Sequence, residues 1–67
     1  MVNSAKLKGL IAEKGLSQAQ VAKTLGMSPK TFYQKMFKGI WKSNELAALK
    51  IALKMSDQQA IDIFFAL

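Results

Sequence analysis

The side chains able to do chemistry in this chain are mostly amines and amides. The sequence has no histidine and no cysteine, and its four carboxylates, Glu13, Glu45, Asp57 and Asp62, are scattered along it. Neither a glycine-rich phosphate loop nor a spacing of metal ligands is present. We therefore expect no enzymatic activity, no metal site, no cofactor and no small-molecule substrate.

The lysines point instead to an anionic partner. They give the chain a formal net charge of +6, and all of them precede residue 55, whereas residues 55–67 carry only Asp57 and Asp62. A lysine excess concentrated in one part of a small chain is typical of proteins that bind nucleic acid. The first candidate partner is therefore a nucleic acid.

Length and composition predict one small globular domain over residues 1–67. Hydrophobic residues make up 51% of the sequence, which is enough for a packed core without disulfides or metals. The absence of cysteine fits a reducing cytoplasm. No apolar run approaches the roughly 20 residues that cross a bilayer, and the N-terminus does not resemble a signal peptide, so we expect no membrane association.

Capping signals divide the chain into five expected helices. Apolar residues recur at helical spacing, and no alternation is long enough for a strand, so the expected fold class is all-α. Glycines follow the apolar stretches as helix C-caps, and serine or asparagine precedes them as N-caps. The expected helices run from after Asn3 or Ser4 to Gly15, from Ser17 to Gly26, from Ser28 through Pro29 to Gly39, from after Ser43 to about Lys54, and from Ser56 to near Phe65.

The second and third of these helices have the spacing of a helix-turn-helix. Such a motif needs a small residue where the helices cross and a glycine in the turn, and Ala22 and Gly26 occupy these places. Val21 and Phe32 supply apolar contacts between the two helices. The spacing from Gln18 through Ala22 and Gly26 to Phe32 is that of the motif.

Residues 17–39 resemble the helix-turn-helix of the Cro and repressor proteins of temperate phages, the Xre-type family. A looser similarity to small repressor-like proteins of phages that infect Gram-positive bacteria extends over Thr31-Phe32, Lys35-Met36, Gly39, Ser43 to Glu45 and Ile63 to Ala66. The resemblance implies a five-helix lambda-repressor-like bundle. It also implies a Cro-like repressor, in the cytoplasm of a bacterial host, that binds double-stranded DNA as a homodimer. Many members carry an aliphatic residue where this chain has Lys35, and we expect Met36 to take that inward place.

In such proteins the N-terminal half of the second motif helix reads base edges in the major groove. Gln34 can pair with N6 and N7 of adenine, and Lys30 can donate to O6 or N7 of guanine. The chain has no arginine, which predicts lysine, glutamine and methyl contacts or a larger share of indirect readout. Winding this helix with Phe32 and Met36 inward places on the outer side Lys30, Gln34, Phe37 and Lys38, with Thr31 and Tyr33 at its flanks. The expected base-reading residues are Lys30, Thr31, Tyr33 and Gln34, and the choice between Gln34 and Tyr33 as chief reader stays open.

A second set of residues is expected to contact phosphates. Gln18 lies at the start of a helix, where family members commonly bind a phosphate and where the helix N-terminus adds partial positive charge. Lys38, Lys42 and Asn44 lie where the DNA backbone passes in the family. Contacts of this kind position a protein without reading sequence. The alternatives are that Lys30, Lys35 and Lys38 merely solvate an exposed face and that Gln18 is an ordinary polar residue at a helix start.

The aromatic residues and the C-terminal tail leave two further questions. Trp41 and Phe37 are expected to cover the core rather than to stack on single-stranded bases. The stretch of residues 60–67 is more apolar than one short helix can hide, so Phe64 and Phe65 are candidates for a dimer contact, although they could equally close the monomer core. The alternative function is a protein-interaction module of the antitoxin or anti-repressor type, which would bind a partner through this tail.

Overall fold

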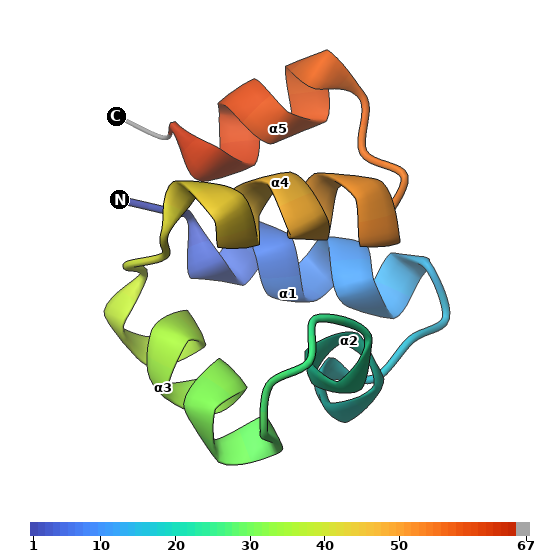
Figure 1. Ribbon diagram of the computed structural model, residues 1–67. Helices are drawn as coiled ribbons and strands as arrows, with labels where there is room; N and C mark the ends of the chain where they lie inside the picture. Colours follow the sequence, from blue (N-terminus) through green and yellow to red (C-terminus); the bar gives the residue numbers. More distant parts are fainter. Residues whose placement is uncertain (66–67) are drawn as a thin grey trace.

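The computed structural model describes residues 1–65, which form five α-helices and no strand (Figure 1). The expected all-α fold is therefore confirmed, while Ala66 and Leu67 of the apolar tail lie outside the described residues. No helix in residues 1–65 is long and apolar enough to cross a membrane. The helices are α1 (Ser4–Glu13), α2 (Gln18–Thr24), α3 (Pro29–Lys38), α4 (Ser43–Ala52) and α5 (Asp57–Phe64).

The N-terminal ends of the helices are set by local caps. The side chain of Asn3 accepts from the Lys6 amide at 3.1 Å and begins α1. At α2 the serine cap is part of a capping box: Ser17 Oγ accepts from the amide of Gln20 at 3.1 Å, and Gln20 Oε1 accepts from the amide of Ser17 at 2.7 Å. The same box begins α5, and a serine cap followed by proline begins α3. Each cap contributes about 1 kcal/mol, so these starts follow from three or four residues of sequence.

Helix α4 begins and ends earlier than the sequence predicts. Its N-cap is Lys42 rather than Ser43, because Glu45 Oε1 accepts from the Lys42 amide at 2.8 Å. At the other end, the Met55 amide donates to the carbonyl of Lys50 at 2.9 Å and closes a Schellman motif, so α4 ends at Ala52 and not near Lys54.

The left-handed residue of a Schellman motif is usually a glycine, because a side chain is strained at positive φ. The ends of α1 and α2 follow this rule, with Gly15 at φ 74° and Gly26 at φ 73°. The end of α4 instead places Lys54 at φ 49°. This helix end therefore forms without the residue that favours it.

The core lies between all five helices. Helix α1 contacts α2 and α5, while α2 contacts α3 and α4. In Figure 1, α2 and α3 lie at one end of the bundle and α5 lies at the other. Burial of each large apolar side chain contributes roughly 1.5–3 kcal/mol. The largest fully buried side chains are those of Phe32, Leu7, Ile11, Leu49, Leu53 and Val21.

The first residues of the chain connect α3 to α5. The amide of Val2 donates to the carbonyl of Gly39 at 3.0 Å, and the amide of Asn3 donates to the carbonyl of Ile63 at 2.7 Å. The hydroxyl of Ser4 donates to the carbonyl of Met36. These bonds satisfy carbonyl groups at the C-terminal ends of two helices, which have no partner within their own helix. The end of α3 is thereby held to the rest of the bundle.

Candidate nucleic-acid interface

Helices α2 and α3 make the most extensive helix contact within residues 1–65. Ala22 is fully buried at this contact, as the crossing of the two helices requires, and Phe32 packs there from α3 with no exposed surface. The turn between the helices passes through Gly26 at positive φ, and the amide of Met27 returns to the carbonyl of Ala22 at 3.0 Å. The residues predicted to form the helix-turn-helix contact thus do so.

The burial of two side chains fixes the rotation of α3 about its axis. Phe32 is fully buried and Met36 is 8% exposed, so Met36 takes the inward place as predicted. The side chain of Lys35 extends toward α4, where its Nζ lies 3.1 Å from Oε1 of Glu45. Helical periodicity does not predict this ion pair, because the two residues belong to different helices.

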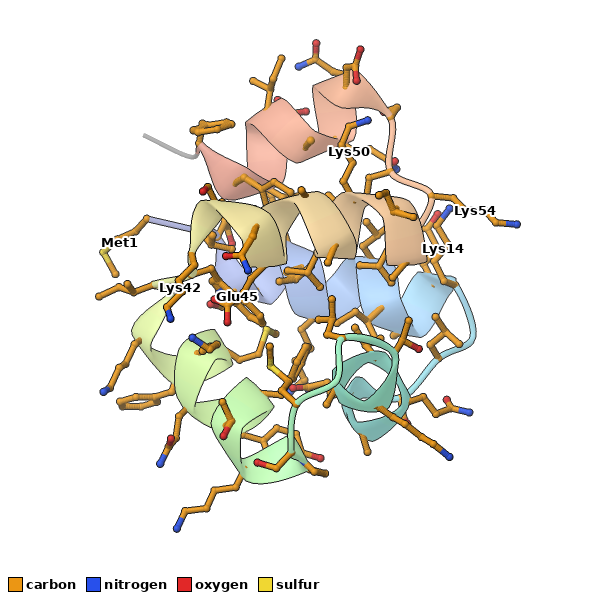
Figure 2. The ribbon with its side chains drawn as sticks, viewed as in Figure 1. Met1, Lys14, Lys42, Glu45, Lys50 and Lys54 are labelled. Carbon is orange, nitrogen blue, oxygen red and sulfur yellow. The ribbon has the colours of Figure 1, made fainter. Side chains whose placement is uncertain are left out.

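The pKa of the Glu45 carboxyl group is shifted by its surroundings. Burial alone would raise the pKa of Glu45, but the hydrogen bond from the Lys42 amide and the nearby ammonium group of Lys35 outweigh it, so that the pKa lies below its ordinary value. Glu45 is therefore charged at neutral pH, and it neutralises Lys35. Figure 2 shows Glu45 and Lys42 at the same end of α4, next to α3.

The rotation of α3 leaves one face of this helix exposed. Five side chains on this face are exposed and line one shallow depression, and in Figure 2 several stick side chains of α3 extend away from the bundle. Lysines stand at both ends of the face, and no carboxylate belongs to it. We call this the α3 outer face, and it consists of Lys30, Tyr33, Gln34, Phe37 and Lys38.

The two aromatic residues expected to cover the core differ. Trp41 does so, because it is half-buried and its ring meets that of Phe32 edge-on, with centroids 5.3 Å apart and an angle of 75° between the planes. The expectation for Phe37 was wrong, since this side chain is 91% exposed. Its place three residues after Gln34, on the outer winding of α3, was the signal in the sequence.

The other candidates for base and phosphate contacts are not among the residues of this face. Thr31 is half-buried, and its Oγ1 accepts from Ser28 Oγ at 3.0 Å in the cap of α3, so it is not part of the α3 outer face. Gln18 is half-buried at the start of α2, while Lys42 and Asn44 are exposed at the start of α4.

The two candidates for a dimer contact are not equivalent. Phe64 is 6% exposed and belongs to the core of the single chain, whereas Phe65 is 65% exposed. Phe64 therefore closes the monomer core, as the alternative interpretation of the tail had it. Of the two, Phe65 alone presents aromatic surface to a second molecule.

Comparison with known protein families places the motif in the same part of the chain. Residues 10–39 match a helix-turn-helix family described as Bacterial regulatory protein, Fis family. The match covers the end of α1, all of α2 and all of α3, which is less than half of the chain. Nothing among the curated proteins or the solved structures matches the chain. The match supports a DNA-binding helix-turn-helix regulator, and it supports the motif as a class rather than the phage repressor family in particular.

Proposed function

We propose that this protein is a sequence-specific regulator of transcription, of the Cro-like repressor type, that binds double-stranded DNA as a homodimer. The observation that carries the proposal is the α3 outer face, an exposed row of polar and aromatic side chains on the second helix of the motif. Its surroundings are basic, since residues 14–44 contain no aspartate or glutamate and hold Lys14, Lys23, Lys30, Lys35, Lys38 and Lys42. A basic surface on a helix-turn-helix fits the phosphate charge of a duplex.

The first two turns of the α3 outer face are assigned to the bases. The major groove is about 12 Å wide, and a helix can enter it with its N-terminal residues toward the base edges. Lys30, Tyr33 and Gln34 lie on this part of α3, and all are exposed. Gln34 has the amide that matches adenine, and Lys30 has the donor that matches guanine. Thr31 keeps a smaller role, because its hydroxyl is engaged with Ser28.

Residues at the borders of the face are assigned to phosphates. Lys38 ends α3, and Lys42 and Asn44 begin α4, so the three flank the loop between these helices. Gln18 lies on the other side, at the N-terminus of α2. Contacts on two sides of a recognition helix fix its register on the duplex.

The proposed dimer uses an apolar surface on α4 and α5. Phe65 and Ile61 are 65% and 53% exposed and line one depression with Ala47 of α4. A neighbouring depression joins Phe65 to Met1 and Ile40, which are also exposed. A two-fold dimer would bury this surface and place two α3 helices on half-sites one helical turn apart.

Selection of bound duplexes from a random pool tests the proposed function. We expect a recovered site with two related halves, centred about 10–10.5 base pairs apart. Gln34→Ala should reduce the preference for the selected duplex over an unrelated duplex about tenfold or more, which is the value of a bidentate base contact. Gln58→Ala, which changes an exposed glutamine on α5, should leave the preference unchanged. Equal affinity for selected and unrelated duplexes would contradict the proposal and favour the protein-interaction module.

Solution mass tests the dimer separately. Sedimentation with and without the selected duplex should show two chains per site. Phe65→Ser should reduce cooperative binding to the two halves, while Ile51→Ser serves as the control. Ile51 is 77% exposed on α4 and lines neither apolar depression. Cooperative binding that Phe65→Ser leaves intact would contradict this surface as the dimer contact.

A further inference from the structure

Phe37 is the most exposed large apolar side chain of residues 1–65. It is 91% exposed, more than Met1 at 81% or Ile51 at 77%. An apolar ring in this position gains nothing from burial within its own chain. The ring is therefore available to bind another molecule, and its neighbours on α3 indicate which kind of molecule.

The neighbours of Phe37 are the side chains proposed to enter the major groove. Phe37 follows Tyr33 by four residues and Gln34 by three, so the three share one face of α3 and line the same depression. At 1.5 Å per residue, Phe37 lies about 6 Å beyond Tyr33 along the helix axis. Successive base pairs are about 3.4 Å apart. With α3 lying along the groove, Phe37 would therefore reach one or two base pairs beyond those proposed for Tyr33 and Gln34.

The apolar surface proposed for the dimer lies elsewhere. Phe65 and Ile61 belong to the α4–α5 side of the molecule, and Met1 and Ile40 line the neighbouring depression. None of the residues that line these two depressions belongs to the α3 outer face. Figure 1 shows α3 and α5 at opposite ends of the bundle. Exposure of Phe37 is therefore not explained by the second copy of the chain.

The chemistry of the ring selects its target. A phenyl ring has no strong hydrogen-bond donor or acceptor, and the apolar group that the base edges present in the major groove is the C5-methyl group of thymine. We infer that Phe37 is a specificity-determining residue that contacts the C5-methyl of a thymine at the outer border of each half-site. This inference rests on the proposed function and adds to it a residue and a base.

Replacement of single thymines by uracil tests the inference, because it removes only the C5-methyl group. The probe is the duplex recovered by selection, with each thymine replaced in turn, and the measurement is Kd at fixed salt. We expect one thymine in each half-site at which the replacement weakens binding of the unaltered protein about fourfold, the value of one buried methyl group. Phe37→Ala should bind the thymine duplex about four- to tenfold more weakly and should be insensitive to the replacement at that position.

Two control variants separate this role from general effects. Phe37→Leu keeps an apolar side chain and should retain part of the sensitivity to uracil at the same position. Ile51→Ala truncates another exposed apolar side chain, on α4 rather than α3, and should retain all of it. Both Phe37 variants should keep the unfolding midpoint of the unaltered protein, since the side chain is not packed.

Three outcomes would overturn the inference. A site in which no thymine is sensitive to uracil would do so, and so would a Phe37→Ala variant that keeps the full sensitivity. Displacement of the duplex by a single strand of the same sequence, dependent on Phe37, would mean that the ring stacks on unpaired bases instead. In each of these cases preference for the selected duplex can persist, whereas loss of that preference in the unaltered protein would overturn the proposed function as well.

Discussion

The ammonium group of Lys35 and the carboxylate of Glu45 lie 3.1 Å apart, which joins α3 to the first turn of α4. Both side chains are partly shielded from solvent, at 23% and 15% exposure. Glu45 also holds the amide of Lys42, so one carboxylate serves as ion-pair partner and as helix cap. One carboxylate therefore links the side of α3 to the start of α4.

Acid should weaken the fold through Glu45. Its pKa is lowered in the folded chain, so its contribution to the free energy of unfolding is complete above the ordinary value near 4.5. That contribution is lost as the pH falls through the lower, folded-state pKa. Denaturant unfolding followed by the fluorescence of Trp41, the only tryptophan, should show this decline below about pH 4.5. Glu45→Gln should cost about 0.5–1 kcal/mol at pH 7 and remove this part of the decline.

Glu13→Gln provides the matched control for this experiment. Glu13 is exposed at the end of α1, and no ion pair joins it to another residue of the described chain. The control should change the free energy of unfolding at pH 7 by less than about 0.5 kcal/mol. Equal effects of the two substitutions would show that the ion pair to Lys35 contributes nothing.

Gly39→Ala should destabilise the protein more than Gly26→Ala. Both glycines have positive φ, which costs a side chain about 1 kcal/mol, but a Cβ at Gly26 meets nothing within 4 Å. A Cβ at Gly39 would lie 3.0 Å from the carbonyl oxygen of Val2 and would strain the bond between Val2 and Gly39. We expect a loss of about 1 kcal/mol at Gly26 and about 2–3 kcal/mol at Gly39, measured by urea unfolding. Equal losses of unfolding free energy at the two positions would mean that the N-terminal residues move away from the added Cβ without a measurable cost.

Lys54→Gly should stabilise the protein. Lys54 has φ 49° in the Schellman motif after α4, where the other two such motifs have glycine. Relief of the strain exceeds the added flexibility of glycine in the unfolded chain, and we expect a gain of about 0.5–1 kcal/mol. Thermal unfolding measures it, and Lys14→Gly, one residue before the left-handed position at the end of α1, is the control. A loss of stability in Lys54→Gly would indicate that the lysine side chain itself stabilises the turn after α4.

Lys38→Gln should lower the salt dependence of DNA binding. If Lys38 contacts a phosphate, its replacement reduces the slope of log K against log salt by about 0.9 for each contact in the duplex. Lys50→Gln removes the same charge from α4, where Lys50 pairs with Asp57 at 3.0 Å, and should leave the slope unchanged. Titrations at several salt concentrations distinguish the two. An equal fall in both variants would mean that only the net charge of the protein matters.

Sequence patterns predicted the helices well because the signals that begin and end them are local. The capping box of Ser17 and Gln20 and the C-caps at Gly15 and Gly26 each involve residues a few positions apart. The displaced start of α4 has the same kind of cause, since Glu45 caps the amide of Lys42. The sequence there has the same pattern, an N-cap residue followed three positions later by a residue that accepts from its amide. The N-cap residue is Lys42, however, and not a serine.

Helical periodicity predicted which residues of the candidate site face outward, but it did not predict their contacts with other helices. Helical winding from Phe32 and Met36 placed Lys30, Gln34 and Phe37 on the outside, and the structure confirms this. The ion pair from Lys35 to Glu45 and the hydrogen bonds at the end of α3 were not predicted, because they join residues of different helices or residues far apart in sequence. Burial of Phe64 beside an exposed Phe65 likewise depends on how α5 meets the core.

The hydrogen bond from Asn3 to Ile63 has a consequence for synthesis on the ribosome. Each helix can form as its residues emerge, within about a microsecond. The amide of Asn3 has its acceptor only after some sixty further residues have been added. Until then the N-terminal residues can bond to the end of α3 but not to α5, so the nascent chain carries the basic helix-turn-helix before the bundle is closed.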